Sequence, residues 1–130
     1  MRGWLLAGVW VIACAQASLG AVEADKVDVL REALAARSVV TFNYKGQTRV
    51  VEPHALGKAN DDKLALLAWQ TAGGSNTEPP PGWRVFLVAE IDGLKVSAGK
   101  FEKPRAGYGA KARGLKSVEV EVAKPGDAER

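Results

Sequence analysis

The sequence is poor in the residues that most often carry catalysis and metal binding. It has one cysteine, Cys14, and one histidine, His54, among 130 residues. A single cysteine cannot form an intrachain disulfide, and a lone histidine cannot build a tetrahedral zinc site. The sequence also has no Gly-x-Ser-x-Gly elbow and no glycine motif that cradles phosphate. A serine–histidine pair stays open, but this composition predicts a protein that is not an enzyme and needs no cofactor.

Net charge is also low, and its distribution is more informative than its sum. The chain carries a formal charge of +3, and its 130 residues are enough for one domain. A basic segment is followed by a mildly acidic end from Ser117 to Arg130. Such a basic segment attracts anions or simply forms a solvated surface, and both interpretations stay open. Its cations, set against Glu102 alone, are Lys95, Lys100, Lys103, Arg105, Lys111, Arg113 and Lys116.

The long apolar run of the sequence lies at its N-terminus. Residues 1–3 form a short cationic start, Trp4 to Ala15 is apolar, and small residues follow as far as Ala21. This order is typical of a secretory signal, and the run is shorter than the roughly 20 residues that span a bilayer. Residues 1–21 are therefore predicted to be a bacterial signal peptide, with export to the periplasm or secretion, rather than a buried N-terminal helix.

Cys14 gives this segment an alternative fate. Its setting in residues 11–14 resembles the lipobox of bacterial lipoproteins, in which the cysteine is lipidated. Cleavage after Ala17 or Ala21 would instead remove Cys14 with the signal. Ordinary cleavage is the favoured prediction, and a contact with the membrane is expected only if Cys14 is lipidated.

Apolar periodicity predicts one helix followed by short strands. Asp25 can cap a helix over residues 26–37, and Pro53, which has no amide donor, is expected to end the second strand. Residues 71–82 form a loop rich in glycine and proline, which is either mobile or a functional lid. Five or six short strands joined by tight turns indicate a mainly β fold, a small barrel or rolled sheet. The predicted strands cover residues 39–44, 48–52, 64–70, 83–88, 94–97 and 118–122.

The order of several residues resembles the WYL domain family. The shared features are a strand that ends in tyrosine, an Arg-x-x-x-Pro element, an Arg-x-Phe strand and an isoleucine a few residues on. The name-giving Trp-Tyr-Leu motif falls on residues 64–66, where only Leu66 is kept. The resemblance covers residues 27–101 of the chain. The matching residues are Tyr44, Arg49, Pro53, Leu56, Arg84, Phe86, Ile91 and Phe101.

The resemblance implies a small SH3-like or Sm-like five-stranded barrel with one N-terminal helix. The domain would cover residues 22–101, and residues 102–130 would form a basic segment with an edge strand and a tail. WYL domains are thought to sense ligands, including nucleic-acid fragments, through basic residues in a groove. Carried over, this makes Arg49 and Arg84 the ligand-binding residues, with Tyr44 and His54 lining the same groove. A guanidinium suits this role because it can donate two parallel hydrogen bonds to phosphate or carboxylate.

Three functions remain open at this point. The first is an exported WYL-like domain that binds an anionic ligand or a cell-envelope partner. The second is an interaction module that uses a sheet edge and the proline-rich loop. The third is a cytoplasmic domain of the transcription-regulator type that binds nucleic acid, which requires that residues 1–21 are not a signal.

The two arginines also have a purely structural interpretation. They could pair with Glu52 and Glu90, or cover apolar surface with their stems. If they bind a ligand, Arg49→Ala and Arg84→Ala are expected to abolish binding while stability stays within about ±0.5 kcal/mol. Phe86→Ala is by contrast expected to damage folding.

Overall fold

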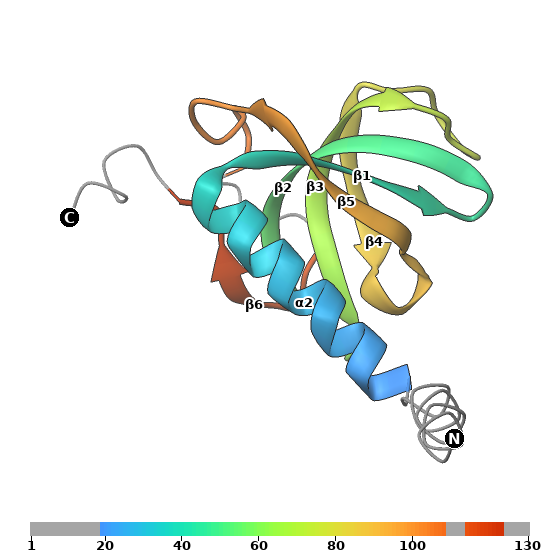
Figure 1. Ribbon diagram of the computed structural model, residues 1–130. Helices are drawn as coiled ribbons and strands as arrows, with labels where there is room; N and C mark the ends of the chain where they lie inside the picture. The colour runs from blue at the N-terminus through green and yellow to red at the C-terminus, as the bar shows by residue number, and fades with distance from the viewer. Residues whose placement is uncertain (1–18, 109–113, 124–130) are drawn as a thin grey trace, which may run out of the picture.

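The computed structural model describes residues 19–108 and 114–123 of the chain. This part is mainly β, with one α-helix and one six-stranded antiparallel sheet (Figure 1). The predicted mainly β fold with one helix is confirmed. The elements are α2 (Leu19–Ala36), β1 (Ser38–Tyr44), β2 (Gln47–Lys58), β3 (Leu64–Gly73), β4 (Gly82–Leu87), the 3-10 helix η1 (Val88–Glu90), β5 (Asp92–Lys100) and β6 (Ser117–Glu121).

The sheet is open. Its strands follow the order β4-β3-β2-β1-β5, so β4 and β5 form its two ends, and β6 pairs with β2 outside this path. Every strand pair is antiparallel. The predicted five-stranded closed barrel is not confirmed, because the described residues form six strands and do not pair β4 with β5.

The β1–β2 hairpin follows directly from the sequence. Buried and more exposed side chains alternate along β1, as period-2 patterning predicts. Lys45 and Gly46 form a two-residue turn with φ angles of 50° and 80°. Positive φ at both central positions gives the twist that favours a tight hairpin. This turn fixes the register that places Arg49 opposite Phe42.

β2 is longer than predicted because it changes neighbour in its middle. Residues 47–51 pair with β1, and residues 55–58 pair with β6. Pro53 lies between these two stretches, next to a register shift in the pairing with β3. A residue without an amide donor is tolerated at such an interruption. The prediction that Pro53 ends the strand was therefore wrong, although its missing N–H does mark the exchange of partners.

Helix α2 packs against the sheet and begins earlier than predicted. It starts at Leu19 rather than near Lys26, so Asp25 lies inside the helix and is not its cap. Figure 1 shows the helix crossing one side of the sheet, where it contacts β1 and β2. Leu30 and Leu34 are fully buried in the same cluster as the core residues of the strands.

The connection between β3 and β4 is shorter than predicted. β3 continues to Gly73, which pairs with Arg49, so the loop covers residues 74–81 instead of 71–82. β5 is also longer than its predicted four residues and runs from Asp92 to Lys100. Both extensions consist mostly of exposed residues at the ends of their strands, where no apolar alternation marks a strand.

The predicted signal lies almost entirely outside the described residues. Residues 1–18 are not described, so cleavage, export and lipidation of Cys14 stay predictions. Cleavage after Ala21 would remove residues 19–21, the beginning of α2. Within residues 19–108 and 114–123, no helix is long and apolar enough to cross a membrane.

Candidate anion-binding site

The two predicted arginines lie on one face of the sheet. Arg49 on β2 is paired with Phe42 on β1, and Arg84 lies two residues before Phe86 on β4. Paired residues of neighbouring strands, and alternate residues of one strand, point to the same side. The guanidinium carbon of Arg49 lies 5.6 Å from the ring centre of Tyr44 and 5.7 Å from that of Phe86. The aromatic cluster of Phe42, Tyr44 and Phe86 therefore lies beside both arginines.

Arg49 is almost completely buried, with 4% of its surface exposed. One terminal nitrogen donates to the Oε1 atom of Gln70 at 3.4 Å, and the other donates to the carbonyl oxygen of Tyr44 at 3.2 Å. Burial lowers the pKa of Arg49, and the positive charge of Arg84 lowers it further. The second effect agrees with the placement of both arginines on one face of the sheet.

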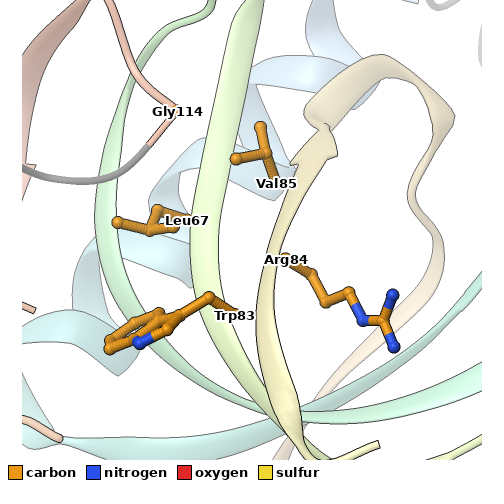
Figure 2. Close-up of a pocket in the computed structure, with 5 residues that line it drawn as sticks. All are labelled: Leu67, Trp83, Arg84, Val85 and Gly114. Carbon is orange, nitrogen blue, oxygen red and sulfur yellow. The ribbon is translucent and has the colours of Figure 1, made fainter. Parts of the chain in front are cut away.

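Arg84 is more accessible than Arg49 and contacts the loop that precedes its strand. Its Nη1 atom donates to the Oγ1 atom of Thr77 at 2.7 Å, and its Nη2 atom donates to the main-chain oxygen of Glu78. Figure 2 shows the Arg84 side chain on the opposite side of β4 from Trp83. Arg84 is among the residues that line the hollow of about 210 Å³ beside Trp83 and Leu67, but its guanidinium points to the other side of the strand.

The loop of residues 74–81 closes one end of this face. The side chain of Asn76 donates to the carbonyl oxygen of Lys45 at 3.1 Å and accepts a hydrogen bond from Gln47 at 3.3 Å. Gln70 donates to the carbonyl oxygen of Gly74 at 2.9 Å. The bonds of Asn76 join the loop to the β1–β2 turn, so the loop and the turn lie side by side at this end of the sheet (Figure 1).

Of the four residues predicted to bind a ligand, Tyr44 lies with the arginines and His54 does not. The hydroxyl oxygen of Tyr44 accepts the backbone N–H of Leu87 at 3.0 Å, which holds the ring in place. His54 is fully buried on the other side of the sheet, with its ring 4.9 Å from that of Trp83 and 5.2 Å from that of Phe101. The structure therefore places Arg49, Arg84 and Tyr44 on one face of the sheet and His54 on the other.

Both ring nitrogens of His54 are occupied by the main chain. Nδ1 lies 2.8 Å from the carbonyl oxygen of Glu52, so it is the donor, and Nε2 accepts the backbone N–H of Arg105 at 2.9 Å. This arrangement requires the neutral ring. Burial lowers the pKa of His54, although the neighbouring carbonyl and carboxylate of Glu52 act in the opposite direction.

The carboxylates proposed as alternative partners do not reach the two arginines. Glu52 accepts hydrogen bonds of 2.8 and 3.0 Å from Arg105, which also lies over the ring of Trp69. Among the described residues, neither Arg49 nor Arg84 forms an ion pair, with Glu90 or with any other carboxylate. The structural interpretation based on local ion pairs therefore does not hold in this part of the chain.

Sequence reasoning missed three residues that belong to the site. Lys45 places its Nζ atom 5.7 Å from the ring centre of Tyr44 and adds a third cation. Gln70 and Thr77 contact the arginines directly. Gln70 pairs with Val51, which lies two residues from Arg49 on β2, so strand pairing could have indicated its face. Lys45 and Thr77 lie in a turn and a loop, where no periodicity shows side-chain direction.

The site can therefore attract and hydrogen-bond a negative charge. Within residues 19–108 and 114–123, no group of His, Cys, Asp and Glu residues could hold a metal ion. The donors at the site are guanidinium and ammonium groups, which bind phosphate and carboxylate oxygens. No protein-family model, curated protein or solved structure matches this chain.

Proposed function

We propose that this chain is a non-catalytic domain that binds an anionic ligand at the sheet face of Arg49 and Arg84. One observation carries the proposal. In the described part of the chain, the buried side-chain nitrogens and oxygens that lack a hydrogen-bond partner are the Nε atoms of these two arginines. Proteins pair nearly all of their buried polar groups, so an unpaired group marks a missing partner such as an ion or a water. Two unmet donors on two permanent cations favour an anion.

The charge balance of the site supports the same ligand. A buried cation normally has a carboxylate partner, because desolvation of an unpaired charge is costly. Arg49 has the carbonyl and amide oxygens of Tyr44 and Gln70 instead, and Arg84 brings a second positive charge close to it. An anion that contacts the more accessible Arg84 would reduce the repulsion between the two guanidinium groups. The positive charge of the buried Arg49 would add to its attraction.

The wider identity is part of the proposal. The order of Tyr44, Arg49, Pro53 and Arg84 favours a WYL-like domain, and the open sheet would then be a variant of the SH3-like barrel. The N-terminal sequence favours export, with the ligand or partner in the periplasm or outside the cell. Nucleic acid would be the ligand only if residues 1–21 are not a signal.

Removing the Arg84 guanidinium is expected to weaken binding by about tenfold or more. A hydrogen bond to a charged group contributes about 1.5–3 kcal/mol, which corresponds to at least this factor. Calorimetric titration of the full chain with pyrophosphate and with a short oligonucleotide, each at low and high salt, measures the effect. Binding to the wild type should weaken as salt rises, because the attraction is electrostatic.

Arg31→Ala is the matched control for Arg84→Ala. Arg31 lies on the exposed side of α2, so its loss changes the net charge equally without touching the site. The proposal fails if neither anion binds, or if Arg31→Ala weakens binding as much as Arg84→Ala. In the second case, the general charge of the chain and not this site would attract the anion.

A sheet-edge interaction is the second candidate function. β5 is an end strand of the sheet, and it is exposed along most of its length. Val96 in this strand keeps 51% of its surface exposed. An end strand with an exposed apolar side chain can pair with a strand of a partner protein. A chain that binds neither pyrophosphate nor oligonucleotide but pairs with a partner through β5 would favour this function.

The mature chain is expected to begin after Ala17 or Ala21. Removal of either segment would eliminate Cys14 from the mature chain. It would also distinguish the exported domain from the cytoplasmic alternative, in which no segment is removed. Cell fractionation followed by intact-mass measurement tests this expectation. A mass gain that fits acylation at Cys14 would show the lipid-anchored alternative, and an unprocessed cytoplasmic chain would contradict export.

A further inference from the structure

The guanidinium of Arg84 is hydrogen-bonded to two neutral oxygens of the chain itself. The two terminal nitrogens of Arg84 donate to two oxygens of the same loop, the hydroxyl of Thr77 and the main-chain carbonyl of Glu78. A guanidinium donates in the same two-pronged way to the two oxygens of a carboxylate or a phosphoryl group. Thr77 and Glu78 therefore stand where two oxygens of one oxyanion would bind.

We propose that the loop of residues 74–81 is a self-ligand that a bound oxyanion displaces from Arg84. This inference rests on the proposed function and adds the ligand class and the regulation of its site. The ligand must present two oxygens on one atom, as a phosphoryl or carboxylate group does. An oxyanion adds Coulomb attraction to the guanidinium that the two neutral loop oxygens lack, so it can replace them.

The loop can leave without opening the core. None of residues 74–81 is buried, so moving the loop away exposes little apolar core. Apart from Arg84, its hydrogen bonds to the rest of the described chain are those of Asn76 with Lys45 and Gln47, and those of Gly74 with Thr48 and Gln70. Segments of this kind open at low free-energy cost while the rest of the fold stays intact.

Displacement has a measurable consequence for affinity. If the closed loop competes with the ligand, the apparent affinity is lowered by the fraction of molecules in which Arg84 is free. Weakening the loop contacts should therefore tighten anion binding. A purely structural loop predicts the reverse, because its loss would disorder the arginine that it holds.

Thr77→Val tests this directly, because it removes one of the two loop oxygens that bind Arg84. It is expected to tighten pyrophosphate binding by the full chain by about 2- to 10-fold, the range of one net hydrogen bond. Asn76→Ala should tighten binding in the same direction, although Asn76 does not touch Arg84. Thr41→Val is the matched control, since alternation places Thr41 on the opposite face of β1 from Phe42, and it should leave the affinity unchanged.

Hydrogen exchange gives a second, independent result. Pyrophosphate is expected to speed up amide exchange in residues 75–78, because the displaced loop becomes more open. If Thr77→Val and Asn76→Ala leave binding unchanged or weaken it while Arg84→Ala abolishes it, the self-ligand is refuted and the anion site stands. If neither the wild type nor Thr77→Val binds pyrophosphate or citrate, the anion site itself is refuted.

Discussion

Phe86→Ala is expected to lower the free energy of unfolding by about 3–5 kcal/mol, the usual cost of truncating a buried phenylalanine. Phe86 is 1% exposed, and its ring centre lies 5.0 Å from those of both Phe42 and Tyr44 in edge-on contacts. Truncation removes buried apolar area, breaks both aromatic contacts and leaves a cavity beside Arg49. Urea unfolding of the full chain, followed by tryptophan fluorescence, measures the change.

Val96→Ala is the control for this truncation. Val96 lies on the end strand β5 with 51% of its surface exposed, so its loss is expected to change stability by no more than about 0.5 kcal/mol. A loss below about 1 kcal/mol for Phe86→Ala would contradict the packing of the aromatic cluster that supports Arg49. Equal losses for both variants would contradict it as well.

Acidification is expected to destabilise the fold through His54. Burial lowers the pKa of His54 in the folded chain below its ordinary value of 6.5. The unfolded chain therefore binds more protons than the folded chain below about pH 6.5, so the free energy of unfolding falls with pH until the folded pKa is reached. The slope approaches about 1.4 kcal/mol for each pH unit in this window. A charged ring would also lose its hydrogen bond from the N–H of Arg105, because Nε2 could no longer accept it.

Two titratable groups that face His54, Arg105 and Tyr108, have pKa values shifted upward, away from this range. Hydrogen bonding to Glu52 raises the pKa of Arg105, and burial raises the pKa of Tyr108, whose hydroxyl donates to Glu121 at 2.6 Å. His54 is also the single histidine of the sequence. We therefore expect this ring to be the main source of a loss of stability between pH 7.5 and 5.5.

Urea midpoints measured from pH 7.5 to 5.5 at constant ionic strength test the histidine prediction. His54→Gln is the matched variant, since its amide can both donate and accept but does not titrate. The wild type should lose stability over this range, and His54→Gln should lose much less. Equal pH dependence in the two proteins would show that His54 is not the titrating group.

The sequence predicts local pairing well because alternation and turn geometry act over a few residues. β1 and the Lys45-Gly46 turn follow from such signals, and the turn fixes the register that places Arg49 opposite Phe42. The extent of β2 does not follow from local signals. Pro53 predicts the end of the strand unless it is known that β2 pairs with β1 before this residue and with β6 after it. That exchange depends on residues about sixty positions further along the chain, which no local pattern shows.

The placement of His54 follows from alternation only once β2 is known to continue past Pro53. It follows Arg49 by an odd number of residues on one strand, which puts the two side chains on opposite faces. What the sequence could not show is the segment of residues 101–108, which covers His54 through Phe101, Arg105 and Tyr108. These contacts join positions far apart in the chain.

Burial of Arg49 changes what its substitution can show. From the sequence, Arg49→Ala and Arg84→Ala are both expected to leave stability nearly unchanged. Only 4% of the surface of Arg49 is exposed, and its guanidinium lies over the rings of Tyr44 and Phe86. Its truncation therefore removes core packing together with any ligand contact. Arg84→Ala, at a partly exposed position, is therefore the variant that separates binding from folding.

Nitrogen NMR of the arginine side chains tests the binding site most directly. The full chain, labelled with ¹⁵N-arginine, would be titrated with pyrophosphate while the Nε–H resonances are followed. Because the Nε atoms of Arg49 and Arg84 are the unmet donors, their two resonances should shift together, while those of Arg31 and Arg105 stay in place. Unmoved resonances of Arg49 and Arg84, at pyrophosphate concentrations that shift other arginines, would contradict an anion site at this face.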